Sequence, residues 1–306
     1  MNVLSPFDGM SGGQISLDEL GIKVDRYYAS EIKEDAIQVT QHNYPSTIQL
    51  GDVCNIKGED LLKIDLLLGG SPCQNLSGAM KEEHRNGLEG EKSKLFYEYV
   101  RLLKETNPKY FLLENVGSMR KSDRDVITSI LGVEPININS SKLSGQLRNR
   151  LYWTNIPNVT QPQDKNINLN DILQDGWSSM KKARCLLESD SRPLTTPIKM
   201  FHRYYSTGFT TLIFKSKLHY ESCMEHYNTY FKDLSAKEID IKLKQEEIDL
   251  SIYDGVRYLN QTELEKLQTV PEGYTSILNR NQAAGLLGDG WNIATIKHIL
   301  SFIPNT

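Results

Sequence analysis

The chain has 306 residues, of which 39% are hydrophobic and 24% charged, and this predicts a packed domain with room for a smaller second lobe. No segment approaches the roughly 18 uninterrupted apolar residues of a membrane helix, and residues 1–7 lack the basic start and apolar run of a signal peptide. None of the four cysteines forms a Cys-x-x-Cys pair, so we expect no metal site, no disulfide framework and a reducing, cytoplasmic location. The net charge of −4 does not indicate a nucleic-acid binder, although a protein with a net negative charge can carry a local basic groove.

The first half of the chain alternates short apolar runs with helix-like stretches. In chain order the strand-like runs are 2–7, 24–30, 48–50, 64–69 and 110–113, and the helix-like stretches are 14–20, 33–42 and 94–107. This alternation predicts an α/β fold with a mostly parallel, Rossmann-like sheet and helices on both faces.

Side chains suited to binding or chemistry follow each of these predicted strands. They are Asp8, Glu31, Asp52, Cys73 and Glu114. Ligands of parallel α/β sheets bind beyond the carboxyl ends of the strands, so we expect the five to meet in one site.

The second half of the chain has a different character. Residues 197–254 are irregular in pattern, apart from a charged, helix-like stretch at 234–252, and helical periodicity returns from 256 to a last helix at 291–302. We therefore expect a catalytic domain over 1–197, a small irregular lobe over 198–254, and a segment over 255–306 that returns to the first domain.

The turn after the first strand, residues 8–13, contains three glycines, which let a backbone approach a ligand closely. Glu31 lies 19 residues beyond Gly12, the spacing at which an acidic residue meets ribose hydroxyls in dinucleotide-binding folds. Asp52 can accept from an adenine amino group. The turn is not a strict G-x-G-x-x-G and no Gly-Lys-Ser/Thr follows, so a nicotinamide dinucleotide and a P-loop are not favoured. A tight turn with two surface acids would explain the same residues.

Cys73 stands on a loop after a buried strand, preceded by Pro72 and two glycines. An isolated cysteine is more often a small buried residue than a nucleophile. The glycines permit an unusual backbone path and Pro72 stiffens it, which favours an exposed, functional cysteine here.

Two further motifs follow. Glu114 begins a Glu-Asn-Val sequence directly after a strand-like run. Gln146, Arg148 and Arg150 alternate in an extended segment and therefore share one face. An exposed edge strand would show the same alternation.

In this order the motifs are similar to those of the DNA (cytosine-5) methyltransferases, and the resemblance extends over nearly the whole chain, from 3 to 303. It rests on Phe7-Asp8-Gly9 with Gly12-Gly13, Pro72-Cys73-Gln74, Glu114-Asn115-Val116, Gln146-x-Arg148-x-Arg150, Arg192 to Pro197, and Trp291-Asn292-Ile293. Residues 20–27, 69–73 and 94–99 look closest to the animal de novo enzymes, whereas the length is more like a bacterial or phage enzyme, and we expect a bacterial or phage origin. Met10-Ser11 and Leu76 depart from the commoner family residues without touching the chemistry.

The resemblance implies an S-adenosylmethionine-dependent methyltransferase of class I, with S-adenosylhomocysteine as the product. The residues that it places at the cofactor are Phe7, Asp8, Gly9, Met10, Ser11, Glu31, Ile32, Asp52, Val53, Gln74, Leu95, Trp291 and Asn292. For Trp291, plain core packing is an equal alternative.

The family's chemistry suits the residue types at the other motifs. Addition of the Cys73 thiolate to C6 of cytosine converts the ring to an enamine, so that C5 can attack a methyl donor. Glu114 is suited to a proton or a hydrogen bond at N3, and Arg150 to stabilising charge at O2. Arg148 is the fourth residue that we expect at the catalytic site.

Double-stranded DNA is the implied partner, with the target base flipped out of the helix. Residues 199–220 contain four basic and no acidic side chains, and we expect Arg203, Lys215 and Lys217, together with Gln146, to contact DNA. The alternative is a merely exposed pair of loops. Further candidates for phosphate contacts are Arg120, Lys121 and Arg124, which would equally suit the solvated start of a helix.

Two other functions are considered. A few members of the family modify transfer RNA, and a silent relative would serve as an accessory protein, although the intact set of Cys73, Glu114, Arg148 and Arg150 argues against silence. The sequence leaves open the recognition site, the preference for maintenance or de novo methylation, a monomeric state, and a link to a restriction endonuclease or to evasion of host restriction.

Overall fold

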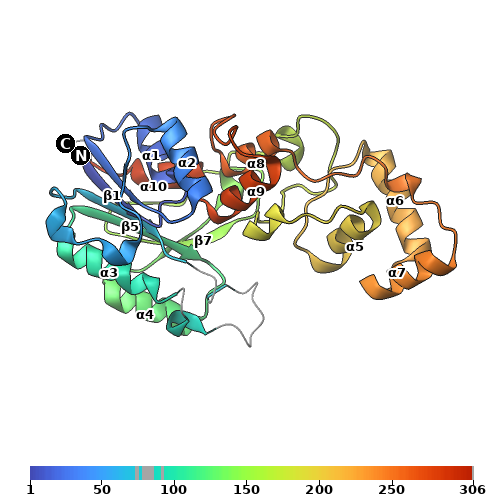
Figure 1. Cartoon of the computed structure of the whole chain (residues 1–306), viewed down its shortest axis with the longest axis horizontal. Coiled ribbons are helices and arrows are strands. Elements are labelled where there is room, and N and C mark those ends of the chain that lie inside the picture. The colour runs from blue at the N-terminus through green and yellow to red at the C-terminus, as the bar shows by residue number, and fades with distance from the viewer. Residues whose placement is uncertain (73–75, 78–85, 91–92, 305–306) are drawn as a thin grey trace.

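The computed structural model describes residues 1–72, 76–77, 86–90 and 93–304. These residues form two lobes joined end to end, with both termini at the far end of the sheet-bearing lobe (Figure 1). The second lobe is helical, and α8 and α9 lie between it and the sheet.

Within the described residues the sheet has seven strands in the order β3-β2-β1-β4-β5-β7-β6. The strands are β1 (Asn2–Pro6), β2 (Arg26–Ser30), β3 (Ile48–Gln49), β4 (Leu66–Gly70), β5 (Tyr110–Val116), β6 (Ile136–Asn139) and β7 (Asn149–Thr154). The first five run parallel, and β7 is antiparallel to both of its neighbours. The predicted α/β class with a mostly parallel sheet is therefore confirmed.

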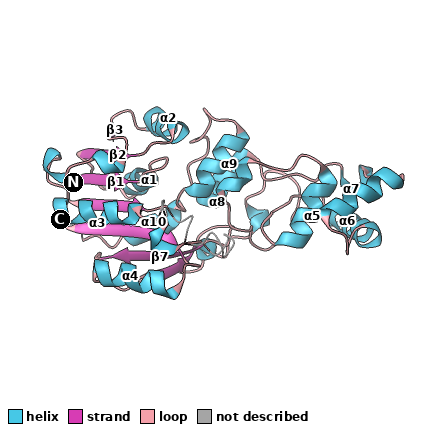
Figure 2. Cartoon of the chain, turned by 60° about the horizontal axis from the view of Figure 1, so that its bottom comes forward, coloured by secondary structure: helices cyan, strands magenta, loops and turns pink. Residues whose placement is uncertain are grey.

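The described helices are α1 (Gly12–Glu19), α2 (Glu34–Asn43), α3 (Leu95–Thr106), α4 (Lys121–Leu131), α5 (Pro197–Thr207), α6 (Lys217–Tyr230), α7 (Ala236–Gln245), α8 (Gln261–Gln268), α9 (Arg280–Asp289) and α10 (Ile293–Leu300). Helices cover both faces of the sheet (Figure 2). Alternate residues of one strand serve the two faces, because successive side chains of a strand point in opposite directions. Leu67 of β4 packs with α3 and α4, whereas Leu66 and Leu68 pack with α1 and α10.

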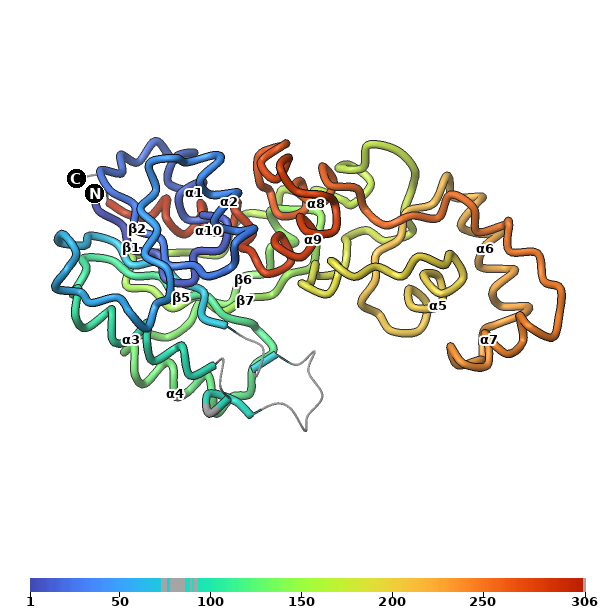
Figure 3. The backbone as a smooth tube through the Cα atoms, viewed as in Figure 1, coloured from blue at the N-terminus to red at the C-terminus, as the bar shows by residue number. Residues whose placement is uncertain are grey.

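The second lobe has a hydrophobic cluster of its own, centred on Phe201, Tyr227 and Tyr253. Short antiparallel bridges tie its entry to its exit, since Trp177 pairs with Phe214 and Ile213 with Arg257. The chain then returns to the sheet, where α10 packs against α1 (Figure 3).

The irregular pattern predicted for residues 197–254 is wrong, because the structure has three helices there. Pro197 occupies the start of α5 and Gly208 ends it with a φ of 74°, which are the usual residues for those positions. The charged stretch from 234 was correctly expected to be helical, and α7 begins there with a capping box between Ser235 and Glu238. No helix in the described part of the chain is long and apolar enough to span a bilayer.

Candidate active site

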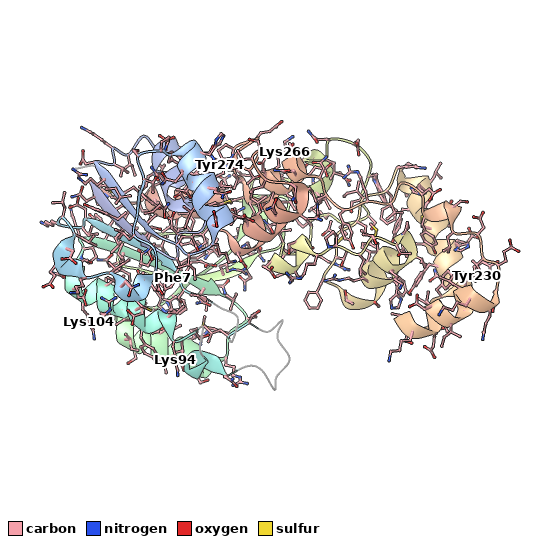
Figure 4. The ribbon with its side chains drawn as sticks, viewed as in Figure 1. Phe7, Lys94, Lys104, Tyr230, Lys266 and Tyr274 are labelled. Atoms are coloured by element: carbon pink, nitrogen blue, oxygen red, sulfur yellow. The ribbon has the colours of Figure 1, made fainter. Side chains whose placement is uncertain are left out.

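A cavity of about 1070 Å³ opens at the carboxyl ends of β1, β2, β4 and β5. Its opposite wall comes from segments that are distant in sequence, namely 184–189, 208–209 and 286–291. Figure 4 shows Phe7 at the end of the sheet that faces this wall, with Tyr230 far away at the tip of the second lobe. The cavity thus lies where the sequence predicted that the strand ends would meet.

The loop between β1 and α1 turns sharply under the cavity. Phe7, Gly9 and Ser11 have φ values of 58°, 59° and 61°, in the left-handed region that non-glycine residues rarely adopt. Phe7 and Gly9 line the cavity, whereas Ser11 is buried and lies outside its lining. The Ser11 hydroxyl donates to Asp8 at 2.5 Å and so holds the loop, and the expected place of Ser11 in the cofactor pocket stays a prediction.

Glu31 is held by backbone N–H groups at the end of β2. Its Oε2 accepts from Gly9 N at 2.9 Å, and its Oε1 accepts from Ile32 N and Lys33 N at 2.8 and 2.9 Å. Asp52 is fixed in the same way, since its Oδ1 accepts from Cys54 N at 2.9 Å. Both carboxylates line the cavity in one defined rotamer, as a binding site for hydroxyl or amino groups requires.

Asp8 is the most perturbed carboxyl of the site. The hydroxyls of Tyr27 and Ser11 donate to its two oxygens at 2.8 and 2.5 Å. Burial is the largest influence and, with the nearby charge of Glu31, raises the pKa of Asp8 to about 6, against the opposing effect of the hydroxyl donors. A carboxyl in that range changes its protonation close to physiological pH.

Glu114 lies on β5, two residues before its end, and not just beyond the strand as expected. Arg150 Nε lies 2.8 Å from its Oε1, and Trp291 Nε1 donates to its Oε2 at 3.2 Å. The side chains of Glu114 and Arg150 are only 11% and 12% exposed. The pair is therefore shielded from solvent but still reaches the cavity.

Asn115 ties β5 to the loop that precedes Cys73. Its Nδ2 donates to the backbone oxygen and the hydroxyl of Ser71 at 3.2 and 3.1 Å, and its Oδ1 accepts from Val116 N at 2.8 Å. Ser71 and Pro72 line the cavity, so the chain enters the Pro72-Cys73-Gln74 sequence at the cavity wall. Cys73 and Gln74 themselves lie outside the described residues.

The hydrogen bonds of Arg148 hold the wall of the cavity together. Its guanidinium is buried and donates to the carbonyls of Leu186, Gly288 and Gly290 at 3.0, 3.2 and 2.7 Å. Burial, with the neighbouring charge of Arg150, lowers the pKa of Arg148. Its contacts fix the segment that leads to Trp291, which indicates a positioning role in place of the expected catalytic one.

Gln146 is fully buried. Its Nε2 donates to Leu267 O and Gln268 Oε1 at 2.9 and 2.8 Å, and its Oε1 accepts from Leu186 N at 3.3 Å. A DNA contact from Gln146 is therefore corrected, because no part of its side chain reaches the surface. Gln146 and Arg148 do share a buried face while Leu147 and Asn149 are exposed, so the exposed edge strand considered from the sequence is wrong.

Most of the residues expected at the cofactor do come together. The cavity is lined by Phe7, Asp8, Gly9, Met10, Glu31, Ile32, Asp52, Val53, Leu95 and Trp291. Asn292 was expected at the cofactor but does not line the cavity. Its Oδ1 instead accepts from Thr295 N and caps α10, and its Nδ2 donates to Leu267 O. Trp291 contributes to both the cavity wall and the packing around α1, so neither of its two predicted roles excludes the other.

The basic residues expected to contact DNA lie in the second lobe. Lys215 and Lys217 are exposed, and Lys217 lies 3.7 Å from Glu221. Arg203 is half-buried on α5. Of this region only Gly208 and Phe209 line the cavity, and Phe209 is 51% exposed.

Several lining residues were missed by the sequence argument. Phe209, Arg184 and Cys185 reach the cavity from the second half of the chain, and Lys33 closes its edge through an ion pair with Asp289. The Cys185 sulfur accepts from Arg148 at 3.5 Å. Of these residues, Phe209 alone could have been found from the sequence, because the preceding Gly208 is typical of a helix end. In the part of the chain that is described, no three His, Cys, Asp or Glu residues gather as a metal site would need.

The fold defines the class of protein. Over 99% of its length the chain is similar to a Spodoptera frugiperda DNMT2 variant (TM-score 0.67, 16% identity, 99% of that chain) and to the Entamoeba histolytica methyltransferase EhMeth (TM-score 0.69, 15% identity, 97% of that chain). At these identities the likeness concerns the fold alone, and it agrees with the expected Rossmann-like sheet.

The sequence comparisons find similarity to one family over part of the chain. The model of the C-5 cytosine-specific DNA methylase family matches residues 1–134. The orphan methyltransferase M.SPRI of Bacillus phage SPR is 28% identical over 81% of this chain and 58% of its own, and the type II methyltransferase M.NgoBV of Neisseria gonorrhoeae is 36% identical over 41% of this chain and 30% of its own. The resemblance to the DNA (cytosine-5) methyltransferases is thus confirmed. The chain spans less than two thirds of the length of these relatives.

Proposed function

We propose that the protein transfers a methyl group from S-adenosylmethionine to C5 of a flipped cytosine in duplex DNA, with Cys73 as the nucleophile. The observation that carries the proposal is the shared cavity. The held carboxylates Glu31 and Asp52 and the Glu114–Arg150 pair line one space of about 1070 Å³, and Pro72, the residue before Cys73, lines it too.

The residues at the β1 and β2 ends suit an adenosyl group. Glu31 and Asp52 each keep lone pairs directed to hydroxyl or amino donors after their backbone bonds are made. Phe7, Val53 and Leu95 supply apolar walls suited to a ring system. When bound, S-adenosylmethionine supplies an electrophilic methyl group on its sulfonium sulfur.

The residues at the β4 and β5 ends suit the base. In the proposed reaction the Cys73 sulfur adds to C6, and the electron pair of the C5–C6 bond becomes available at C5. Glu114 bonds the N3 edge of the ring and Arg150 holds the O2 side, where negative charge develops. After methyl transfer, loss of the C5 proton and elimination of the thiolate restore the aromatic ring.

The second lobe, residues 198–254, is proposed as the target-recognition region. Its helices place Phe209 beside the cavity while Lys215 and Lys217 stay exposed on its surface. Lysines at such positions can bind phosphates of the DNA backbone. Flipping the base out of the stack costs a few kcal/mol, and contacts between the enzyme and the extruded base offset that cost.

The test is transfer of labelled methyl groups from S-adenosylmethionine to unmethylated duplex DNA of mixed sequence, followed by base-resolution mapping of methylcytosine. Wild type, Cys73→Ala and Cys54→Ala are compared, the last as a matched control because Cys54 is an exposed thiol near the third strand. A parallel reaction contains transfer RNA in place of DNA.

We expect incorporation into DNA by the wild type and Cys54→Ala, clustered at one short motif, and none by Cys73→Ala. Methyl transfer by Cys73→Ala at the wild-type rate would refute the nucleophile. Incorporation into RNA alone would refute the substrate while keeping the chemistry, and a wild type that binds the cofactor but modifies neither would indicate an accessory role.

A further inference from the structure

The indole of Trp291 lies between Glu114 on β5 and the start of α1. Its Nε1 donates to Oε2 of Glu114 at 3.2 Å, on the side of the proposed base site. Its six-membered ring contacts the start of α1, next to the loop that forms the floor of the proposed cofactor site. One rigid side chain therefore spans from the cofactor loop to the carboxyl on β5.

Gly70 leaves the room that this side chain needs, and Gly12 and Gly13 lie next to its ring. A Cβ at Gly70 would lie 2.7 Å from Trp291 Nε1, and one at Gly12 or Gly13 would lie 3.7 Å from ring carbons. The first distance is shorter than a carbon–nitrogen contact allows, so any larger residue at position 70 must displace the indole. Gly70 pairs in register with Glu114, which places the clearance directly beside the hydrogen bond.

The backbone leading to Trp291 is also fixed. The buried guanidinium of Arg148 donates to the carbonyls of Gly288 and Gly290, and Gly290 N donates to Leu286 O at 2.9 Å. The indole N–H is thus aimed by the protein before any ligand binds. Oε1 of Glu114 is held separately by Arg150, so the two carboxyl oxygens have different partners from different segments.

We infer that Trp291 is a positioning residue for Glu114, which couples occupation of the cofactor site to engagement of the flipped base. The inference rests on the proposed function and deepens it. Cofactor packed against the loop of residues 7–11 limits movement of the neighbouring indole, and a fixed indole holds Oε2 of Glu114 in place for the base.

The coupling has a measurable size. A hydrogen bond to a charged group contributes about 1.5–3 kcal/mol, and about 1.4 kcal/mol corresponds to a tenfold change in an equilibrium constant. Coupling between two binding sites is reciprocal, so either ligand can be used to detect it. Saturating S-adenosylhomocysteine should tighten binding of a duplex by about tenfold in the wild type.

The test compares duplex Kd values with and without S-adenosylhomocysteine for the wild type, Trp291→Phe and Trp153→Phe. The duplex is one that the wild type methylates. Phenylalanine keeps an aromatic ring but has no N–H. Trp153 is the matched control, because it is buried and donates its own indole N–H to Thr128 Oγ1 at 3.0 Å. It packs on the opposite face of the sheet from Trp291. Gly70→Ala provides a second route, since its φ is not in the left-handed region and the added Cβ would crowd the hydrogen bond itself, at 2.7 Å from Trp291 Nε1 and 3.1 Å from Glu114 Oε2.

We expect the tenfold effect to fall to about onefold in Trp291→Phe and Gly70→Ala and to persist in Trp153→Phe, with kcat reduced about tenfold and the KM for S-adenosylmethionine within about twofold of wild type. Coupling that survives in Trp291→Phe overturns the role of Trp291 while leaving the proposed function intact. The same conclusion follows if the wild type methylates DNA but shows no coupling. A wild type that methylates no DNA overturns the proposed function and this role with it.

Discussion

Replacing Asp8 by asparagine should make the protein more stable at neutral and alkaline pH. Asp8 is half-buried at the cavity wall, and desolvation there raises its pKa from 3.8 to about 6. The folded protein therefore prefers the protonated carboxyl, and this preference stabilises the fold below about pH 4. The stabilisation is lost as the pH rises through about 6, because the carboxyl must then ionise inside the protein.

The size of the effect follows from the pKa difference. One pKa unit corresponds to about 1.4 kcal/mol, so ionisation of Asp8 costs the folded state at most about 3 kcal/mol above pH 7. Asparagine stays neutral at every pH and can still accept from one of the two hydroxyls that now donate to Asp8. Asp8→Asn should therefore match the wild type near pH 4 and exceed its unfolding free energy by up to about 3 kcal/mol at pH 8.

Urea unfolding at half-unit steps from pH 4 to pH 8 measures the difference. Asp60→Asn is the control, because Asp60 is an exposed carboxyl at the end of the short helix Gly58–Asp60 and does not line the cavity. A parallel pH dependence for wild type and Asp8→Asn would refute the reasoning. If the stabilisation is found together with weaker binding of S-adenosylmethionine, the carboxylate serves binding at the expense of stability.

Three further changes test the contacts around the site. Arg148→Met should lower the unfolding free energy by about 3 kcal/mol and weaken S-adenosylhomocysteine binding at least about tenfold, measured by calorimetry, since the wall segment loses its carbonyl anchor. Arg257→Ala should cost about 3–5 kcal/mol in urea unfolding, because the buried carboxylate of Glu263 loses its cationic partner and keeps only backbone N–H donors from Gln174 and Asn260 among the described residues; a loss under 1 kcal/mol would contradict this. Glu265→Ala should cost about 2–4 kcal/mol in the same assay, because the carboxyl accepts from Thr275 N and its hydroxyl and from Gly273 N, and Glu265→Gln should recover part of that loss.

The sheet and its strand ends were predictable from the sequence because each parallel strand is a short apolar run followed by a polar residue. The run at 2–7 became β1 (Asn2–Pro6), and Glu31 and Asp52 line the cavity as their places after strands required. Local patterns were sufficient there, since the contacts in question lie within the repeating unit of strand, turn and helix.

Other residues could not be assigned in that way. Ser11 and Asn292 belong to family motifs, but their side chains satisfy local polar groups, and sequence alone does not distinguish a cap from a ligand contact. The partners of Arg148 are carbonyls up to 142 positions away, which no local pattern encodes. The helix α5 was missed because its apolar residues are interspersed with basic and aromatic ones, although Pro197 and Gly208 marked its two ends.

The late position of Trp291 has a consequence for synthesis of the protein on the ribosome. The strands that carry Asp8, Glu31 and Glu114 are translated first and can begin to associate early. The wall that completes the cavity, with the partner of Glu114 and the anchor points of Arg148, is supplied by residues 286–291. A nascent chain that ends before α9 would thus hold every proposed catalytic group and still lack the wall that completes the cavity, so the proposed activity would require synthesis through at least Trp291.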